Sequence, residues 1–76
     1  MTDPRELDVG AVAPRVRHPL IFSTFEDLLA GESFVLISDH DPKPLYYQFD
    51  AARRDQFRWE YLAMGPDEWQ ARMTHA

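Results

Sequence analysis

The run Phe34-Val35-Leu36-Ile37 decides the fold, because no polar residue interrupts these consecutive apolar positions. A run of aromatic and β-branched side chains predicts a central strand that is covered on both faces or nearly so. Gly31 precedes the run and is a natural end for a helix. Residues 39–44 follow it and interrupt it with charged residues and prolines. We therefore expect the chain to fold around this strand, with a helix on either side of it in sequence.

The first helix is predicted upstream of the central strand. Pro19 suits the first helical position, where the missing N–H of proline costs nothing. Residues 6–9 alternate polar and apolar side chains, which predicts a short first strand, and residues 10–18 are expected to form a loop. Four apolar residues after Pro19 have the spacing of one helical face: Ile21, Phe25, Leu28 and Leu29.

The second helix is predicted downstream, with Asp41 as its N-cap and Pro42 at its first position. Its core-facing residues are expected to be Leu45, Phe49 and Ala52. Two alternating segments, residues 57–64 and 69–73, then flank a Gly-Pro-Asp turn, which predicts a β-hairpin. The hairpin residues expected to face the helices are Phe57, Trp59, Tyr61, Trp69 and Met73.

This order, β-α-β-α-β-β, predicts an α+β two-layer sandwich with two helices on one face of a mixed four-stranded sheet. A right-handed crossover makes the first two strands parallel. The 76 residues are expected to form a single domain, residues 1–76, with residues 1–5 as a flexible tail. A chain of this length buries only about 60% of its unfolded surface, so a shallow site is expected rather than a large enclosed cavity.

Composition excludes several kinds of chemistry. The chain has no cysteine, so a disulfide, a thiolate metal site and a cysteine nucleophile are impossible. The net charge of −5, with scattered basic residues, disfavours nucleic-acid binding. No segment approaches the roughly 20 apolar residues of a membrane span, and the N-terminus lacks a signal-peptide pattern. We expect a cytoplasmic protein that is a monomer or, through an exposed edge strand, a homodimer.

Polar side chains are expected to meet at one edge of the sheet. Parallel neighbouring strands deliver the loops that follow them to the same edge, where both helices also begin. Helix N-termini present N–H groups and partial positive charge there. The expected ligand-binding residues are Arg17 and His18 from the first loop, Asp39, His40, Asp41 and Lys43 from the second, and the solvent-facing Tyr47.

One interpretation of this cluster is a metal site. His18 and His40, with Asp39 or Asp41 and with help from Glu60, offer imidazole and carboxylate ligands that iron, zinc or copper accept. The cofactor would then be a transition metal, and its identity is left open.

Two other interpretations need no metal. In the first, Arg17, His18, Lys43 and the helix N-terminal amides hold a carboxylate or a phosphate. In the second, the residues are structural: Asp41 caps the second helix, and His18 caps the first helix or packs at its start. Asp39 then holds a loop or pairs with Arg17.

Several segments are similar to a known family. They are residues 17–22, residues 39–48 (Asp-His-Asp-Pro-Lys-Pro-Leu-Tyr-Tyr-Gln), Trp59-Glu60-Tyr61, and Gly65-Pro66 with Trp69. In these segments the chain resembles a small bacterial domain family of unknown function, whose members occur alone or fused to hemerythrin-like iron-binding domains. The resemblance implies a link to iron, oxygen or nitric-oxide metabolism.

A more distant resemblance is to the TusA/SirA-like sulfur carriers. They share the element order and a first strand of the type Leu7-Asp8-Val9. Their Cys-Pro-x-Pro segment, aligned on Pro19, places Val16 where the family has its persulfide-carrying cysteine. Persulfide transfer by this chain alone is therefore excluded.

These observations favour a non-enzymatic binding or accessory module with no catalytic residues. It would bind a small anionic ligand or a metal ion at the paired loops, or a protein partner through the exposed face of its sheet. The alternative is a metal- or redox-cofactor-binding protein or an enzyme that uses His18 and His40, since histidine changes charge near neutral pH.

Overall fold

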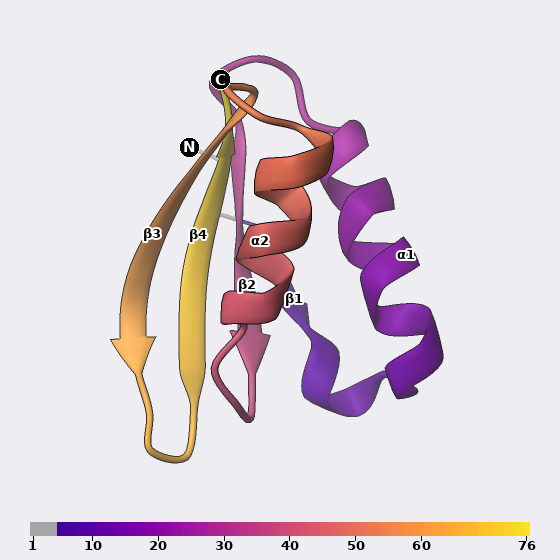
Figure 1. Cartoon of the computed structure of the whole chain (residues 1–76). Coiled ribbons are helices and arrows are strands. Elements are labelled where there is room, and N and C mark those ends of the chain that lie inside the picture. The colour runs from indigo at the N-terminus through magenta and orange to yellow at the C-terminus, as the bar shows by residue number, and fades with distance from the viewer. Residues whose placement is uncertain (1–4) are drawn as a thin grey trace.

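A four-stranded mixed sheet forms one layer of the computed structural model, and two helices cover one face of it (Figure 1). The structure describes residues 5–76. The elements are β1 (Arg5–Asp8), the 3-10 turn η1 (Val9–Ala11), α1 (Pro14–Glu26), β2 (Ser33–Ser38), α2 (Lys43–Ala52), β3 (Phe57–Met64) and β4 (Trp69–His75). The predicted fold class and element order are confirmed. The predicted tail falls on residues 1–4, which lie outside the described residues, and on Arg5, which belongs to β1.

The strands lie in the order β1-β2-β4-β3. β1 runs parallel to β2, with Leu7 opposite Leu36, as the right-handed crossover predicts. β4 is antiparallel to both of its neighbours. Phe34 and Leu36 belong to the core cluster, and Val35 between them is also buried on the opposite face. This burial explains why the central strand has no polar position in its middle.

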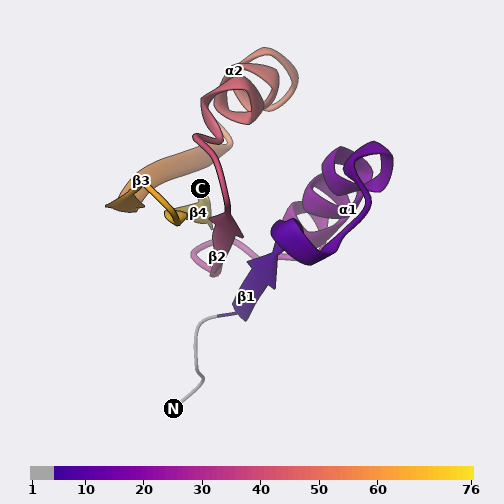
Figure 2. The same ribbon diagram turned by 90° about the horizontal axis from the view of Figure 1, so that it is seen from below.

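The core lies between the sheet and the two helices, which Figure 2 shows on the same side of the strands. Phe49 of α2 stacks on Phe22 of α1, with ring centroids 4.1 Å apart and ring planes 3° apart. It also meets Phe25 edge-on at 5.2 Å and Phe57 of β3 at 5.6 Å. The aromatic rings therefore join both helices to the far strand of the sheet.

The first helix begins five residues earlier than the sequence predicted. Pro14, not Pro19, occupies its first position, and the expected loop of residues 10–18 is largely η1 and helix. Pro19 lies inside α1 on an exposed surface, where it leaves the carbonyl of Arg15 without its helical N–H donor. Water can hydrate a carbonyl on that side, so the helix tolerates the proline.

The predicted ends of the helices also need correction. α1 stops at Glu26, so the helical spacing no longer applies at Leu29, which is 72% exposed. Gly31, with φ +87°, lies in the turn before β2, where its N–H donates to the carbonyl of His75 at 2.8 Å. Pro42 is the N-cap of α2, and Ala52 at the other end of that helix is exposed. None of the described helices has the length and apolarity needed to cross a bilayer.

The predicted hairpin is confirmed, and its turn depends on Gly65. This residue has φ +73°, and a Cβ added to it would lie 2.9 Å from ring carbons of Trp69. We expect Gly65→Ala to lower the free energy of unfolding by about 1–2 kcal/mol, because it combines backbone strain with a steric clash.

Gly31→Ala is the matched control for this prediction. Gly31 also has a positive φ, but a Cβ there meets no atom within 4 Å. Urea unfolding of the two variants separates strain from clash. An equal loss of stability in both would show that the Trp69 contact contributes nothing.

Candidate functional site

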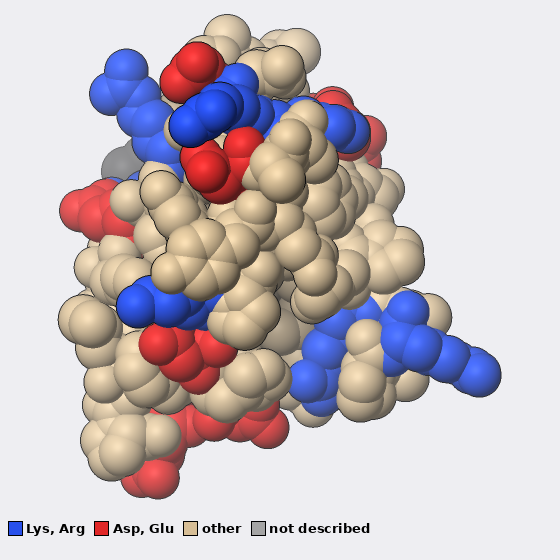
Figure 3. Space-filling model, in the orientation of Figure 1, with Lys and Arg blue, Asp and Glu red and all other residues tan. Residues whose placement is uncertain are grey.

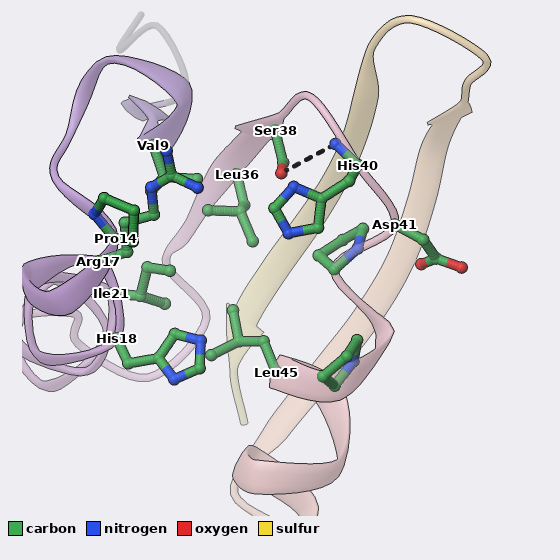
Figure 4. Close-up of a pocket in the computed structure, with 12 residues that line it drawn as sticks. Val9, Pro14, Arg17, His18, Ile21, Leu36, Ser38, His40, Asp41 and Leu45 are labelled. Atoms are coloured by element: carbon green, nitrogen blue, oxygen red, sulfur yellow. Dashed lines mark hydrogen bonds between the residues drawn. The ribbon is translucent and has the colours of Figure 1, made fainter.

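A pocket of about 290 Å³ lies between the start of α1 and the loop that joins β2 to α2. Both of these segments follow the parallel strands β1 and β2, so they meet at one edge of the sheet as the sequence predicted. Four of the predicted residues line this pocket: Arg17, His18, His40 and Asp41. Figure 4 shows Arg17 and His18 on the α1 side and His40 on the side of the β2–α2 loop.

The polar part of the pocket is built from both sides. Arg17 donates from Nε to the carbonyl of Val12 at 2.7 Å, which anchors its guanidinium at the start of α1. Its two terminal nitrogens have no acceptor among the described residues. Ser38, buried at the end of β2, accepts the backbone N–H of His40 at 3.3 Å. A bidentate donor and two imidazoles thus border one cavity.

The remainder of the pocket is apolar and stiff. Its floor consists of core side chains from four elements: Val9, Ile21, Leu36 and Leu45. Three proline rings, Pro14, Pro42 and Pro44, complete its wall. Proline has little backbone freedom to lose, so this wall is largely formed before any ligand arrives.

The two aspartates of the second loop form contacts outside the cavity. Asp39 does not line the pocket; its carboxylate pairs with Nδ1 of His40 at 2.7 Å, which holds the pKa of Asp39 below its ordinary value. The predicted alternative pairing of Asp39 with Arg17 is not the contact formed. Asp41 accepts the N–H of Lys43 at 3.0 Å and the hydroxyl of Tyr61 at 2.8 Å. Its carboxylate points away from the histidines in Figure 4.

This arrangement does not gather the metal ligands that the sequence suggested. Within residues 5–76, no three carboxylate or imidazole side chains converge in a geometry that could hold a metal ion. Glu60, expected to assist, lies on the sheet face opposite the helices, where it binds Arg72 at 3.0 Å. His18 and His40 share the pocket without a carboxylate directed between them.

The helix amides are also less available than predicted. In the first turn of α2, the N–H of Lys43 donates to Asp41, Pro44 has no N–H, and the N–H of Leu45 donates to the carbonyl of Pro42 at 3.0 Å. In α1, Pro14 has no N–H and Val16 donates to the carbonyl of Ala13. Side chains, rather than a cradle of backbone amides, must therefore provide most hydrogen bonds to a ligand.

Lys43 and Tyr47, the other predicted site residues, line a second pocket instead. This pocket, of about 170 Å³, lies between α2 and β3 and has aromatic walls. The residues that line it are Lys43, Tyr46, Tyr47, Trp59 and Tyr61. Tyr47 is 60% exposed, as expected from its place opposite the core face of α2. The hydrogen bond from Tyr61 to Asp41 connects a residue that lines the second pocket with one that lines the first.

The Tyr61–Asp41 contact leads to a testable prediction about how the stability of the protein depends on pH. Burial, followed by the neighbouring Asp41 carboxylate, raises the pKa of Tyr61 above its ordinary value of 10.0. A raised pKa in the folded state means that folding favours the protonated phenol. The stabilisation is therefore complete below the unfolded pKa and is lost as the pH rises through the higher folded pKa.

Ultraviolet titration of the tyrosines checks this expectation. We expect one tyrosine to ionise later than the others, and Tyr61→Phe to remove this late phase. Tyr47→Phe, which removes an exposed hydroxyl, is the control and should leave the late phase in place. A late phase that survives Tyr61→Phe contradicts the assignment.

Sequence reasoning missed two residues that shape the site. Ser38 lies directly before the recognised polar stretch, and its position as the last residue of a buried strand is the signal that could have found it. Tyr61 is 20 residues from Asp41 in sequence, so no local pattern connects them.

Comparison with known proteins identifies a family model. Residues 6–75 match the model described as "Uncharacterized conserved protein (DUF2249)". No curated protein and no solved structure matches the chain.

Proposed function

Because the chain belongs to the DUF2249 family, whose description carries no activity, we propose a function from the pocket itself: this domain is a binding module for a small organic carboxylate. The observation that carries the proposal is the charge distribution around the cavity. The Arg17 guanidinium and two imidazoles line it, while the carboxylates of Asp39 and Asp41 are engaged elsewhere. The start of α1 adds partial positive charge on the same side.

Local charge supports an anion although the chain as a whole is acidic. The formal net charge is −5, and Figure 3 shows basic and acidic side chains interspersed over the face drawn. A ligand at short range interacts mainly with the groups that line its pocket, because interactions between exposed charges more than about 8 Å apart are largely screened at physiological salt. These nearest groups are Arg17, the two histidines and Asp41, and the Asp41 carboxylate is already hydrogen-bonded to Lys43 and Tyr61.

The shape of the pocket restricts the ligand further. A volume of about 290 Å³ lies at the lower end of the range for small-molecule sites. The apolar floor favours a ligand with an apolar body, and the guanidinium favours a planar carboxylate that can accept two parallel hydrogen bonds. A small aromatic or branched aliphatic acid satisfies both conditions better than inorganic phosphate does.

Benzoate titration tests this proposal, with benzyl alcohol and benzylamine as neutral and cationic probes of similar shape. We expect benzoate to raise the melting temperature and the other two probes to have little effect. Arg17→Ala should weaken benzoate binding about tenfold or more, since a hydrogen bond to a charged group contributes about 1.5–3 kcal/mol. Arg15→Ala is the matched control, because Arg15 is exposed on α1 and does not line the pocket.

Two outcomes would overturn the carboxylate function. One is equal binding of benzoate by the Arg17→Ala variant and the native chain. The other is stoichiometric Zn²⁺ binding, by protein without a histidine tag, that is lost in the His18→Ala/His40→Ala double variant. The second result would replace the carboxylate with a metal. The link to iron, oxygen or nitric-oxide metabolism stays a prediction that rests on resemblance alone.

A further inference from the structure

The outer side of β3 is an open sheet edge. β3 pairs with β4 on one side only, and no strand among residues 5–76 lies on its other side. It has eight residues, Phe57–Met64, and none of them is a proline. Proline is one of the residues by which natural sheet edges prevent pairing with another strand. Its one irregularity is a bulge between Tyr61 and Ala63, so residues 57–61 form a regular strand.

Charges along this strand complement each other when the strand meets a copy of itself. Arg58 and Glu60 lie two residues apart on the sheet face away from the helices. In an antiparallel pair with its two-fold axis at Trp59, each Arg58 lies opposite the Glu60 of the other copy, so the dimer gains two cross-strand ion pairs. Arg58 has no acidic partner among the described residues, whereas Glu60 already binds Arg72.

The same charges disfavour other registers. An axis at position 58 would place two arginines opposite each other, and an axis at position 60 would oppose two glutamates; like charges directly opposite are destabilising. Only the axis at Trp59 pairs opposite charges over the regular part of the strand. If the register between the two strands changed by one residue, apolar side chains of one strand would lie opposite polar side chains of its partner.

Half-buried aromatic side chains flank this edge on the helix side. Phe57, Trp59 and Tyr61 are only partly covered by α2, and the exposed Tyr47 lies beside them across the aromatic pocket. In the register centred on Trp59, each Phe57 lies opposite a Tyr61 and the two tryptophans lie opposite each other. Aromatic cross-strand pairs are among the more stabilising ones, so pairing would bury surface that the single chain leaves open.

We propose that β3 is a homodimer interface, in which two copies of this chain join antiparallel through Phe57–Tyr61 to form an eight-stranded sheet. The interface is isologous, since the same surface is used by both copies. It is far shorter than a standard protein interface, so the dimer is in rapid, concentration-dependent equilibrium with the monomer. The carboxylate pocket, which β3 does not line, is independent of it.

Two charge reversals on the full chain provide the test. Arg58→Glu gives a strand with carboxylates at both positions, and Glu60→Arg gives one with two guanidinium groups. Sedimentation velocity up to about 1 mM should show a reversible dimer for the native chain, weakened about tenfold or more in either variant. An equimolar mixture of the two variants should form a heterodimer, because each acidic position then faces a basic one.

The control is Arg15→Glu, which makes the same change in net charge on α1 and should leave the native dimer unchanged. The Arg58 side chain has no hydrogen bond or ion pair with any of residues 5–76, so the thermal unfolding of Arg58→Glu should match that of the native protein. A native chain that stays monomeric at about 1 mM overturns the proposal. A dimer that both reversals leave intact, or a variant mixture that stays monomeric, overturns it as well.

Discussion

Replacing Phe49 with alanine is expected to lower the free energy of unfolding by about 3–5 kcal/mol. Phe49 of α2 is fully buried and contacts two rings from α1 and one from β3. Its removal leaves a cavity bounded by Phe22 and Phe25 of α1 and Phe57 of β3, which cannot all relax into the space. A chain of this size has a stability of only about 4–11 kcal/mol, so much of the population could unfold.

The control for this prediction lies two residues earlier on the same helix. Tyr47→Ala removes an aromatic ring from the exposed side of α2, and it should change stability by no more than about 0.5 kcal/mol. Urea unfolding followed by circular dichroism measures both variants. Similar losses at positions 47 and 49 would show that the core does not depend on the Phe49 contacts.

The second large effect is expected at Asp41, whose carboxylate joins the loop before α2 to β3. Asp41→Ala removes the acceptor of the Lys43 N–H, a contact of the capping type that contributes about 0.5–2 kcal/mol. It also removes the acceptor of the partly buried Tyr61 hydroxyl, a charge-assisted bond of about 1.5–3 kcal/mol. We expect a total loss of about 2–4 kcal/mol, since the two contributions overlap in part.

A double-mutant cycle separates the two contributions. Tyr61→Phe removes only the second contact, so its effect should shrink markedly in the Asp41→Ala background. Asp39→Ala is the neighbouring control, and its loss should be smaller because the Asp39–His40 pair is exposed to solvent. Additive effects of Asp41→Ala and Tyr61→Phe would contradict the proposed coupling.

The Asp41 prediction also bears on the carboxylate pocket. The same loop carries His40, and the Asp41 contacts on its other side hold the loop against α2 and β3. Asp41→Ala should therefore weaken benzoate binding although the Asp41 carboxylate points away from the two histidines of the pocket. Asp41→Asn keeps hydrogen-bond acceptors and should restore part of both stability and binding.

Much of the architecture could be predicted from local patterns. The run of residues 34–37 predicted the central strand, because a strand that is paired on both sides and largely buried tolerates four apolar residues in succession. The alternation in residues 57–64 predicted β3 and the side of the sheet that its aromatics face. Both predictions rest on periodicity, which is a property of the chain itself.

Element boundaries were predicted less well. Pro14 and Pro19 both suit a first helical position, and nothing local distinguishes them. The tertiary structure distinguishes the two prolines. The helix begins at Pro14, and its first turns place Arg17 and His18 at the border of the pocket. Pro19 is tolerated inside the helix because it faces water. Leu29 was misplaced for a related reason, since helical spacing predicts a face only while the helix continues.

By itself, then, the sequence determined the order of elements, the parallel start of the sheet and the edge at which polar residues meet, because hydrophobic periodicity and crossover handedness act through local backbone geometry. Only the tertiary structure decided which of those polar groups share a cavity. Asp41 and Tyr61 are 20 residues apart in sequence, and their hydrogen bond holds the carboxylate in a direction that leads away from the two histidines. The direction of a side chain depends on partners that folding brings near it, and no spacing along the chain contains that information.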